Sequence, residues 1–358
     1  MTLKNETRIP WIDIVKGILI IAIVLGHVFT DGKIRWWLYS FHVPAFFFIS
    51  GYCYKRKESF GGYFKNKIRG IVIPYVIFSL ISILIFYLGS IVYTPLTTMA
   101  ECNPIKNIIV MLYGNSKPDG MRYNLPLWFL PCLFSVSMIA YGIDLFGDKW
   151  KKKHLVRLTG IILGIIIGIF FRNNEDIALP WHIETASSML VWYLCGIECR
   201  EYRIIESYTG KNRNNRIIAV LVSMGILVVG ACISFFNVRV VGVREEHYGV
   251  LGIYYVAAIL GIVGCIGISV AISKCKLLEI LGKNTLGVLV IHKFPILFFQ
   301  KFVPITSKLL AEPDTFGGVL CAVLVTAIVV ICALVGTHFI RIVAPWTLGI
   351  KDVQRKRY

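Results

Sequence analysis

The first apolar run reads Trp11-Ile-Asp13-Ile-Val-Lys16-Gly17-Ile-Leu-Ile-Ile-Ala-Ile-Val-Leu-Gly26-His27 and carries only three ionisable side chains. An α-helix needs about 20 mostly apolar residues to cross the hydrocarbon core of a bilayer. No cleavage site of small residues follows the run, so it does not resemble a secretory signal peptide. We therefore expect it to remain in the protein as a transmembrane helix.

This apolar character continues along the whole chain. Of its 358 residues, 56% are hydrophobic and only 16% are charged, and the mean hydropathy is +0.71. Ordinary soluble domains are about half apolar and about a quarter charged. The composition argues against a water-soluble enzyme, a disordered protein or a nucleic-acid-binding domain. It predicts an all-α, polytopic membrane protein in which residues 1–358 form a single transmembrane domain.

Apolar runs of spanning length recur ten times. They lie at about 11–30, 36–54, 71–93, 125–145, 157–172, 181–199, 217–236, 250–273, 284–303 and 317–341. The ninth is interrupted by His292, Lys293 and Pro295. We predict a bundle of about ten transmembrane helices.

The basic residues set the expected orientation, although the net charge of +18 could by itself suggest a nucleic-acid partner. With the amino terminus in the cytoplasm, 26 Lys and Arg residues fall on the cytoplasmic side and nine on the other. Cytoplasmic loops carry an excess of Lys and Arg in membrane proteins. We expect a plasma (inner) membrane protein with both termini in the cytoplasm and no nucleic-acid partner.

The first helix is expected to carry a polar stripe. Lys16 and His27 are 11 positions apart, which at about 100° per residue places them about 20° apart in direction and ~16 Å apart along the axis. Asp13 lies within pairing reach of Lys16. Ionisable groups inside spans are costly and mark functional sites. The alternative is that Asp13 and Lys16 anchor the helix at the inner interface while His27 reaches the outer one.

Other polar residues interrupt the later spans. His42 stands two residues before Pro44, where a local break in the helix would create a polar spot; a kink with a buried structural histidine is the alternative. Lys67 and Arg69 belong to a basic run that either anchors the inner face or binds phosphates. The remaining polar points are Asn124, Trp128, the stretch Trp181-His182-Ile-Glu184, Glu198 and His292.

The sequence contains no Walker A loop, GxSxG elbow, HExxH or GxGxxG motif. Nor does it contain a CxxC pair, and we interpret the ten cysteines as small apolar fillers of the helices. No metal site is predicted. Two classes of function therefore remain: catalysis by histidine and carboxylate side chains inside the membrane, and transport.

These residues resemble the acyltransferase 3 family of integral membrane O-acyltransferases. The family's first helix has a basic residue, ten further residues and then His, which Lys16 and His27 match. The form Asp-x-x-Lys-Gly…Gly-His is similar to the branch of fucose 4-O-acetylase-like and polysaccharide acetyltransferases. Further matches are Phe41-His42-Val-Pro44…Ser50-Gly51-Tyr52, the basic run before Pro74-Tyr75, Leu127-Trp128-Phe129-Leu130 and Leu281-Gly282-Lys283-Asn284-Thr285-Leu286…His292. The resemblance covers nearly the whole chain.

Two departures from the family pattern bear on function. The Arg-x-x-Arg element after the second helix is only approximated by Lys65, Lys67 and Arg69. The fused extracytoplasmic esterase-like domain of some members is also not expected here, so we expect the chain to act alone or with a separate partner of polysaccharide biosynthesis.

The resemblance implies acetyl transfer from acetyl-CoA to a hydroxyl of a sugar, a surface polysaccharide or its lipid-linked precursor. It implies that His27 is catalytic, as general base or as transient acyl carrier, together with Asp13 and Lys16. Lys16, Lys67 and Arg69 are expected to bind acetyl-CoA, and His42, Trp128 and His292 to bind the acceptor. The alternatives are a transporter or flippase without acyl transfer, against which the lack of a second broken span argues, and a structural partner in a synthesis complex.

Overall fold

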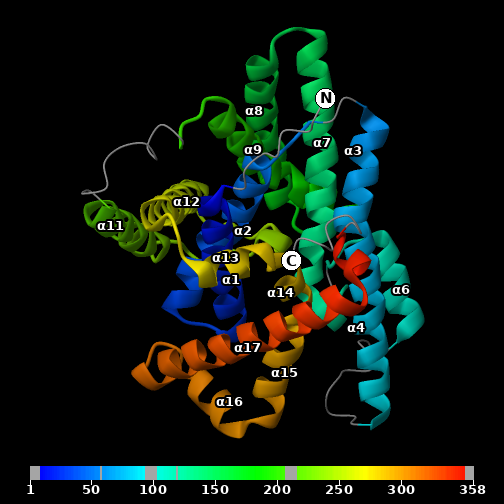
Figure 1. Ribbon diagram of the computed structural model, residues 1–358, viewed down its shortest axis with the longest axis vertical. Helices are drawn as coiled ribbons and strands as arrows, with labels where there is room; N and C mark the ends of the chain where they lie inside the picture. Colours follow the sequence, from blue (N-terminus) through cyan, green and yellow to red (C-terminus); the bar gives the residue numbers. More distant parts are fainter. Residues whose placement is uncertain (1–8, 57–58, 93–102, 118–119, 206–215, 351–358) are drawn as a thin grey trace.

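The computed structural model describes residues 9–56, 59–92, 103–117, 120–205 and 216–350. Within these ranges the protein is helical, apart from short connections and one isolated bridge between Gly242 and His247. The terminal segments 1–8 and 351–358, which we expect in the cytoplasm, lie outside the described residues. The fold class is therefore all-α, as the sequence predicts (Figure 1).

Each of the ten predicted spans is helical. The helices are α1 (Pro10–Val28), α2 (Lys33–Tyr52), α4 (Ile73–Val92), α7 (Phe129–Lys149), α8 (Lys153–Arg172), α9 (Ile183–Glu201), α11 (Arg216–Ser234), α12 (Leu251–Ile272), the pair α14 (Thr285–Ile291) and α15 (Lys293–Phe302), and α17 (Phe316–Val343). The predicted interruption of the ninth span is confirmed, because α14 and α15 meet at His292.

Eight helical segments of the described chain are long and apolar enough to cross a membrane. Among the ten predicted spans, only α2 and α9 are not in that set. Both are more polar, and most of their residues are buried against other helices rather than exposed to lipid. A helix surrounded by protein does not need a continuous apolar surface, which explains why these two carry so many of the ionisable residues. The protein is a polytopic bundle of membrane helices.

Shorter elements complete the fold. They are α3 (Phe60–Lys67), a π-helical turn (Ile68–Val72), α6 (Pro104–Tyr113), α13 (Lys276–Lys283), α16 (Pro304–Leu310) and the 3₁₀ turns at Arg122–Trp128, Pro180–His182, Val243–Glu245 and Pro345–Leu348. Tyr75 of α4 donates a hydrogen bond to the carbonyl oxygen of Met111 (2.8 Å), which holds α6 against α4. α3 and α4 run along one side of the molecule with α6 beside them (Figure 1).

Glycines allow two close helix crossings that position the site. A Cβ on Gly51 of α2 would meet the backbone of Tyr193 in α9, and a Cβ on Gly196 of α9 would meet the backbone of Phe48 in α2. In the same way, Gly17 of α1 lies against Leu278 of α13. Small residues of this kind let membrane helices approach closely enough for backbone contact. These crossings fix α1 and α2, which carry His27 and His42, at the centre of the bundle (Figure 1).

Candidate active site

His27 lies one residue before the end of α1, and its side chain is partly exposed. Its Nδ1 is 3.3 Å from the hydroxyl oxygen of Tyr39 on α2. The ring of His292 lies beside it, with the two ring centroids 5.3 Å apart. The structure therefore brings together two histidines that the sequence separates by most of the chain.

His42 joins the same group through Tyr39, since the rings of these two residues pack edge to face with centroids 5.0 Å apart. The guanidinium of Arg35 lies 4.8 Å from the centre of the Tyr39 ring. His42 and His292 are buried, at 3% and 0% exposure. Of the three histidines, His27 is the one with surface left for a substrate.

Backbone contacts fix the tautomers of the two buried histidines. Nδ1 of His42 lies 2.6 Å from the carbonyl oxygen of Leu38, and Nδ1 of His292 lies 3.0 Å from that of Val288. A carbonyl oxygen only accepts hydrogen bonds, so each Nδ1 carries the proton and each Nε2 keeps a lone pair. Nε2 of His292 is buried without a hydrogen-bond partner among the described residues. It is therefore ready to accept a proton or a hydrogen bond from a bound group.

Asn124 holds α14 in place next to His292. Its side-chain nitrogen donates to the carbonyl oxygen of Val290 (3.0 Å) and to the hydroxyl of Ser82 on α4 (3.1 Å). Asn124 is fully buried, and a buried amide that bridges two helices is costly to disturb. Asn124, which the sequence analysis lists among the polar residues of the spans, therefore helps to position His292.

Asp13 and Lys16 occupy the other half of α1. Asp13 is only 5% exposed, and its backbone lies against Gly282 of α13, while Lys16 is half-buried. Asp13 is therefore covered by protein, and its role as an interfacial anchor or as part of a functional stripe stays open. The pairing of Asp13 with Lys16 and the catalytic role of both remain predictions.

Lys67 and Arg69 stand where α3 gives way to the π-helical turn. The Lys67 ammonium lies 5.2 Å from the centre of the Tyr63 ring, and Arg69 is exposed. Single π-helical turns inside helices occur frequently at functional sites. Whether these two residues bind the phosphates of an acyl-CoA remains a prediction.

The indole ring of Trp128 packs against two neighbouring rings. Its ring lies 5.4 Å from that of His182 and also contacts Phe129. Whether Trp128 binds an acceptor remains a prediction.

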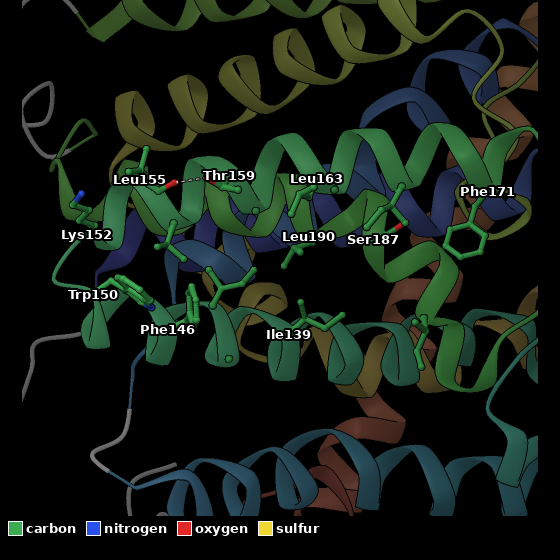
Figure 2. Close-up of a pocket in the computed structure, with 17 residues that line it drawn as sticks. Ile139, Phe146, Trp150, Lys152, Leu155, Thr159, Leu163, Phe171, Ser187 and Leu190 are labelled. Atoms are coloured by element: carbon green, nitrogen blue, oxygen red, sulfur yellow. Dashed lines mark hydrogen bonds between the residues drawn. The ribbon is translucent and has the colours of Figure 1, made fainter.

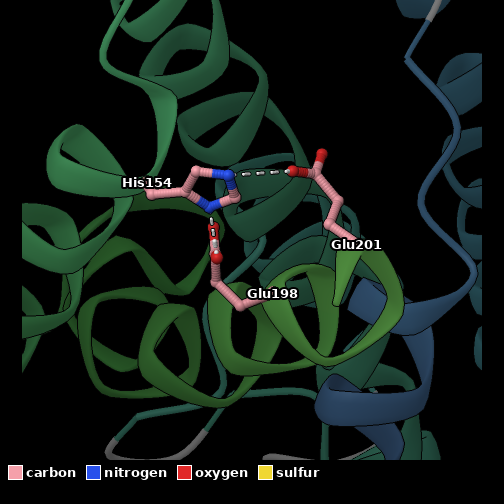
Figure 3. A group of neighbouring side chains, drawn as sticks. All are labelled: His154, Glu198 and Glu201. Carbon is pink, nitrogen blue, oxygen red and sulfur yellow. Dashed lines mark hydrogen bonds and ion pairs between the residues drawn. The ribbon is translucent and has the colours of Figure 1, made fainter. Parts of the chain in front are cut away.

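An ion network lies at the ends of α7, α8 and α9, and of its members the sequence analysis names only Glu198. Arg157 is 2% exposed. It binds Asp144 through Nε (2.7 Å), and Glu198 (2.9 Å) and Glu201 (2.8 Å) through Nη1. His154 lies 2.7 Å from Glu198 and 4.0 Å from Glu201 (Figure 3).

His154, Glu198 and Glu201 could hold a metal ion by geometry, since their ligand atoms lie within 4.8 Å of one another. However, both carboxylates already bind the Arg157 guanidinium, which a metal would have to displace. The arrangement fits a clamp between three helices better than a metal centre.

A large apolar groove runs between α7, α8 and α9 (Figure 2). Its volume is about 910 Å³, and its lining includes Ile139, Leu163 and Leu190, with Lys152 and Trp150 at one end. None of the three histidines of the His27 group lines it. The groove therefore belongs to the helix surface and is separate from the candidate chemistry.

The comparisons with known proteins agree with this geometry. Residues 9–337 match the family described as "Acyltransferase domain", known as acyltransferase 3. No curated protein and no solved structure matches the chain. Because the family match covers most of the chain and includes every predicted site residue, this protein belongs to the acyltransferase 3 family and is a multi-pass membrane acyltransferase.

Proposed function

We propose that this protein is an O-acetyltransferase that moves an acetyl group from cytoplasmic acetyl-CoA to a hydroxyl of a sugar or surface polysaccharide, or of its lipid-linked precursor. The observation that carries the proposal is the partly exposed His27 between Tyr39 and His292, in a chain of the acyltransferase 3 family. The similarity of Asp13-x-x-Lys16-Gly17…Gly26-His27 to the fucose 4-O-acetylase-like branch supports the sugar acceptor.

The positively charged residues support the entry of acetyl-CoA from the cytoplasmic side of the membrane. Lys67 and Arg69 supply positive charge for the phosphates of acetyl-CoA, and half-buried Lys16 adds a further cation on α1, the helix that carries His27. His27 lies ~16 Å further along the helix, on nearly the same face. The pantetheine arm follows this stripe, and the thioester reaches the imidazole.

His27 acts on the acetyl transfer in one of two ways. It takes the proton from the acceptor hydroxyl as general base, or it accepts the acetyl group on a ring nitrogen and passes it on. In both, Tyr39 orients the ring by its hydrogen bond to Nδ1. The lone pair on Nε2 of His292 accepts a hydrogen bond from the bound acceptor. His42 and Trp128 complete the acceptor site, and separate polysaccharide-synthesis proteins supply the acceptor.

The test uses purified protein, radiolabelled acetyl-CoA and a glycan extract from the host, and it measures CoA release and label transfer. Wild type should transfer label, and His27→Ala should lose transfer at least about 100-fold. His338→Ala is the matched control, because His338 is exposed on α17. Activity retained by a folded His27→Ala variant would contradict the mechanism. Absence of CoA turnover by wild type would instead favour a transporter or flippase.

A further inference from the structure

A serine, a histidine and a glutamate, the residue types of a catalytic triad, lie together beside Trp128 and outside the His27 group. They are Ser116, two residues after the glycine that ends α6, together with His182 and Glu184 at the start of α9. The Ser116 hydroxyl lies 2.9 Å from Nε2 of His182. Nδ1 of the same ring lies 3.3 Å from Oε1 of Glu184. A hydroxyl, an imidazole and a carboxylate are thus connected in series.

The protonation of His182 follows from its partners. The backbone N–H of Ser116 also donates to Nε2 of His182 (3.1 Å), so Nε2 carries the lone pair. The proton of the neutral ring is then on Nδ1, facing the Glu184 carboxylate. This is the tautomer that a histidine needs in order to take a proton from a serine hydroxyl.

Glu184 is held in place by three groups besides His182. Asn115 donates to Oε1 (2.7 Å), the backbone N–H of Leu179 donates to Oε2 (3.1 Å), and the Lys117 ammonium lies 3.9 Å from Oε1. These contacts keep a buried carboxylate charged and oriented. A carboxylate fixed in this way sets the direction of the imidazole.

The backbone is strained where it turns the histidine toward Ser116. Trp181 and His182 both have left-handed conformations, with φ of 56° and 53°. Such conformations are unfavourable for non-glycine residues and persist where surrounding contacts impose them. Here Ser135 donates to the Trp181 carbonyl oxygen (2.8 Å), and the Trp128 ring packs on the imidazole. Strained residues of this kind are concentrated at active sites.

Arg244 connects this group with the first one. Its Nη1 donates to the Ser116 carbonyl oxygen (3.2 Å), and its side chain is 19% exposed. Arg244 and its neighbour Glu245 are also close enough to Tyr39 to interact with it electrostatically, and Tyr39 binds His27. Ser116, His182 and Glu184 are buried, whereas Arg244, which donates to the Ser116 carbonyl oxygen, is partly exposed.

We propose that Ser116, His182 and Glu184 form a second acyl-transfer centre, in which Ser116 receives the acyl group from His27 and delivers it to the acceptor hydroxyl. The proposal rests on the proposed function, in the form in which His27 carries the acyl group. The positive charge of Arg244, which binds the Ser116 carbonyl oxygen, stabilises the oxyanion that forms beside Ser116.

The transfer balances in two steps. In the first, Ser116 Oγ bonds to the acyl carbon, the bond from that carbon to the His27 nitrogen breaks, and the Ser116 proton passes through His182 to the leaving imidazole. In the second, the acceptor oxygen bonds to the acyl carbon and the bond to Ser116 Oγ breaks. The acceptor's proton passes through His182 Nε2 back to Ser116. Glu184 orients the imidazole and balances its charge in both steps.

The experiment compares wild type, Ser116→Ala and His27→Ala with radiolabelled acetyl-CoA. Ser116→Ala keeps the backbone N–H that binds His182, so its melting temperature should be unchanged. We expect it to release about one CoA per protein in a burst, while label transfer to the glycan extract falls at least about 100-fold. His27→Ala should lose both. Ser269→Ala, which removes another buried hydroxyl that binds only a helix carbonyl, should behave as wild type.

A direct readout is the acyl-enzyme itself. Wild type quenched in acid without acceptor should carry one acetyl group on the peptide that contains Ser116, because a serine ester survives acid whereas an acyl-imidazole hydrolyses. Transfer by Ser116→Ala at the wild-type rate, or loss of its CoA burst along with transfer, would overturn the relay. Failure of wild type to release CoA would instead refute the proposed function itself.

Discussion

The imidazole rings of His27 and His292 pack against each other with centroids 5.3 Å apart, although the residues lie near opposite ends of the chain. His292 stands at the junction of α14 and α15, and its Nδ1 binds the Val288 carbonyl oxygen one turn earlier. Nε2 is then left with its lone pair inside the site. A buried histidine of the ninth span thus packs against His27, the proposed catalytic residue.

Replacement of His292 by Ala should lower the rate of acetyl transfer while the fold is retained. Loss of a hydrogen bond to a reacting group costs about 1–3 kcal/mol, which is a loss of about 5- to 150-fold in kcat/KM. The measurement is label transfer from acetyl-CoA under conditions where the melting temperature is recorded in parallel. The control is again His338→Ala, and wild-type kinetics for His292→Ala would contradict a role for Nε2.

Gly282→Val should destabilise the protein by separating α1 from α13. A Cβ at Gly282 would overlap the backbone of Asp13, which no side-chain rotation can relieve. Overpacking at a close contact costs about 1–3 kcal/mol. Gly225→Val in α11 has open space around its Cβ and carries the same change in helix propensity. We expect the melting temperature to fall for Gly282→Val and to stay near wild type for Gly225→Val, whereas equal values would refute the crossing.

Arg157→Ala should be more destabilising still, because it leaves Asp144, Glu198 and Glu201 without their shared cation. Removal of one partner from a buried ion pair costs about 3–5 kcal/mol. Thermal unfolding in detergent should show a large decrease. Arg239→Ala, which removes an exposed pair with Glu175, should change stability by less than about 1 kcal/mol. A similar small effect for Arg157→Ala would argue against the clamp.

Stability should fall with rising pH because of Glu246, in the connection between α11 and α12. Burial raises the pKa of its carboxyl from 4.5 to about 7. Between these two values the folded protein keeps a proton that the unfolded chain has released, so each pH unit costs about 1.4 kcal/mol. The contribution is fully present below the lower value and is lost as the pH rises through the higher one.

Melting temperatures measured from pH 5 to pH 8 should therefore decrease for wild type and level off above about pH 7. Glu246→Gln keeps the acceptor for the Tyr248 hydroxyl, 2.9 Å away, and should remove this part of the slope. Lys117 and Glu184 also act on the Glu246 carboxyl, with opposite signs. An unchanged pH slope in Glu246→Gln would assign the effect to another group.

The amino-acid pattern alone was enough to predict the helical class, the positions of ten long helical runs and the break at His292. These are local properties: apolar length, helical period and proline position act within about 20 residues of one another. The family motifs added His27, His42 and His292 as candidates. Neighbours in sequence were enough for these predictions, since each depends on one helix at a time.

Which residues contact one another across the bundle could be read only from the folded structure. The contacts of His27 with His292, of Ser116 with His182 and of Arg157 with Glu198 each join separate helices or loops, and no periodicity within one segment encodes them. The same holds for α2 and α9, whose polar residues are tolerated because neighbouring helices cover them. Partners across the bundle are selected by packing, through backbone contacts such as Gly51 with Tyr193 and Gly282 with Asp13. That selection positions the acyltransferase chemistry within the membrane.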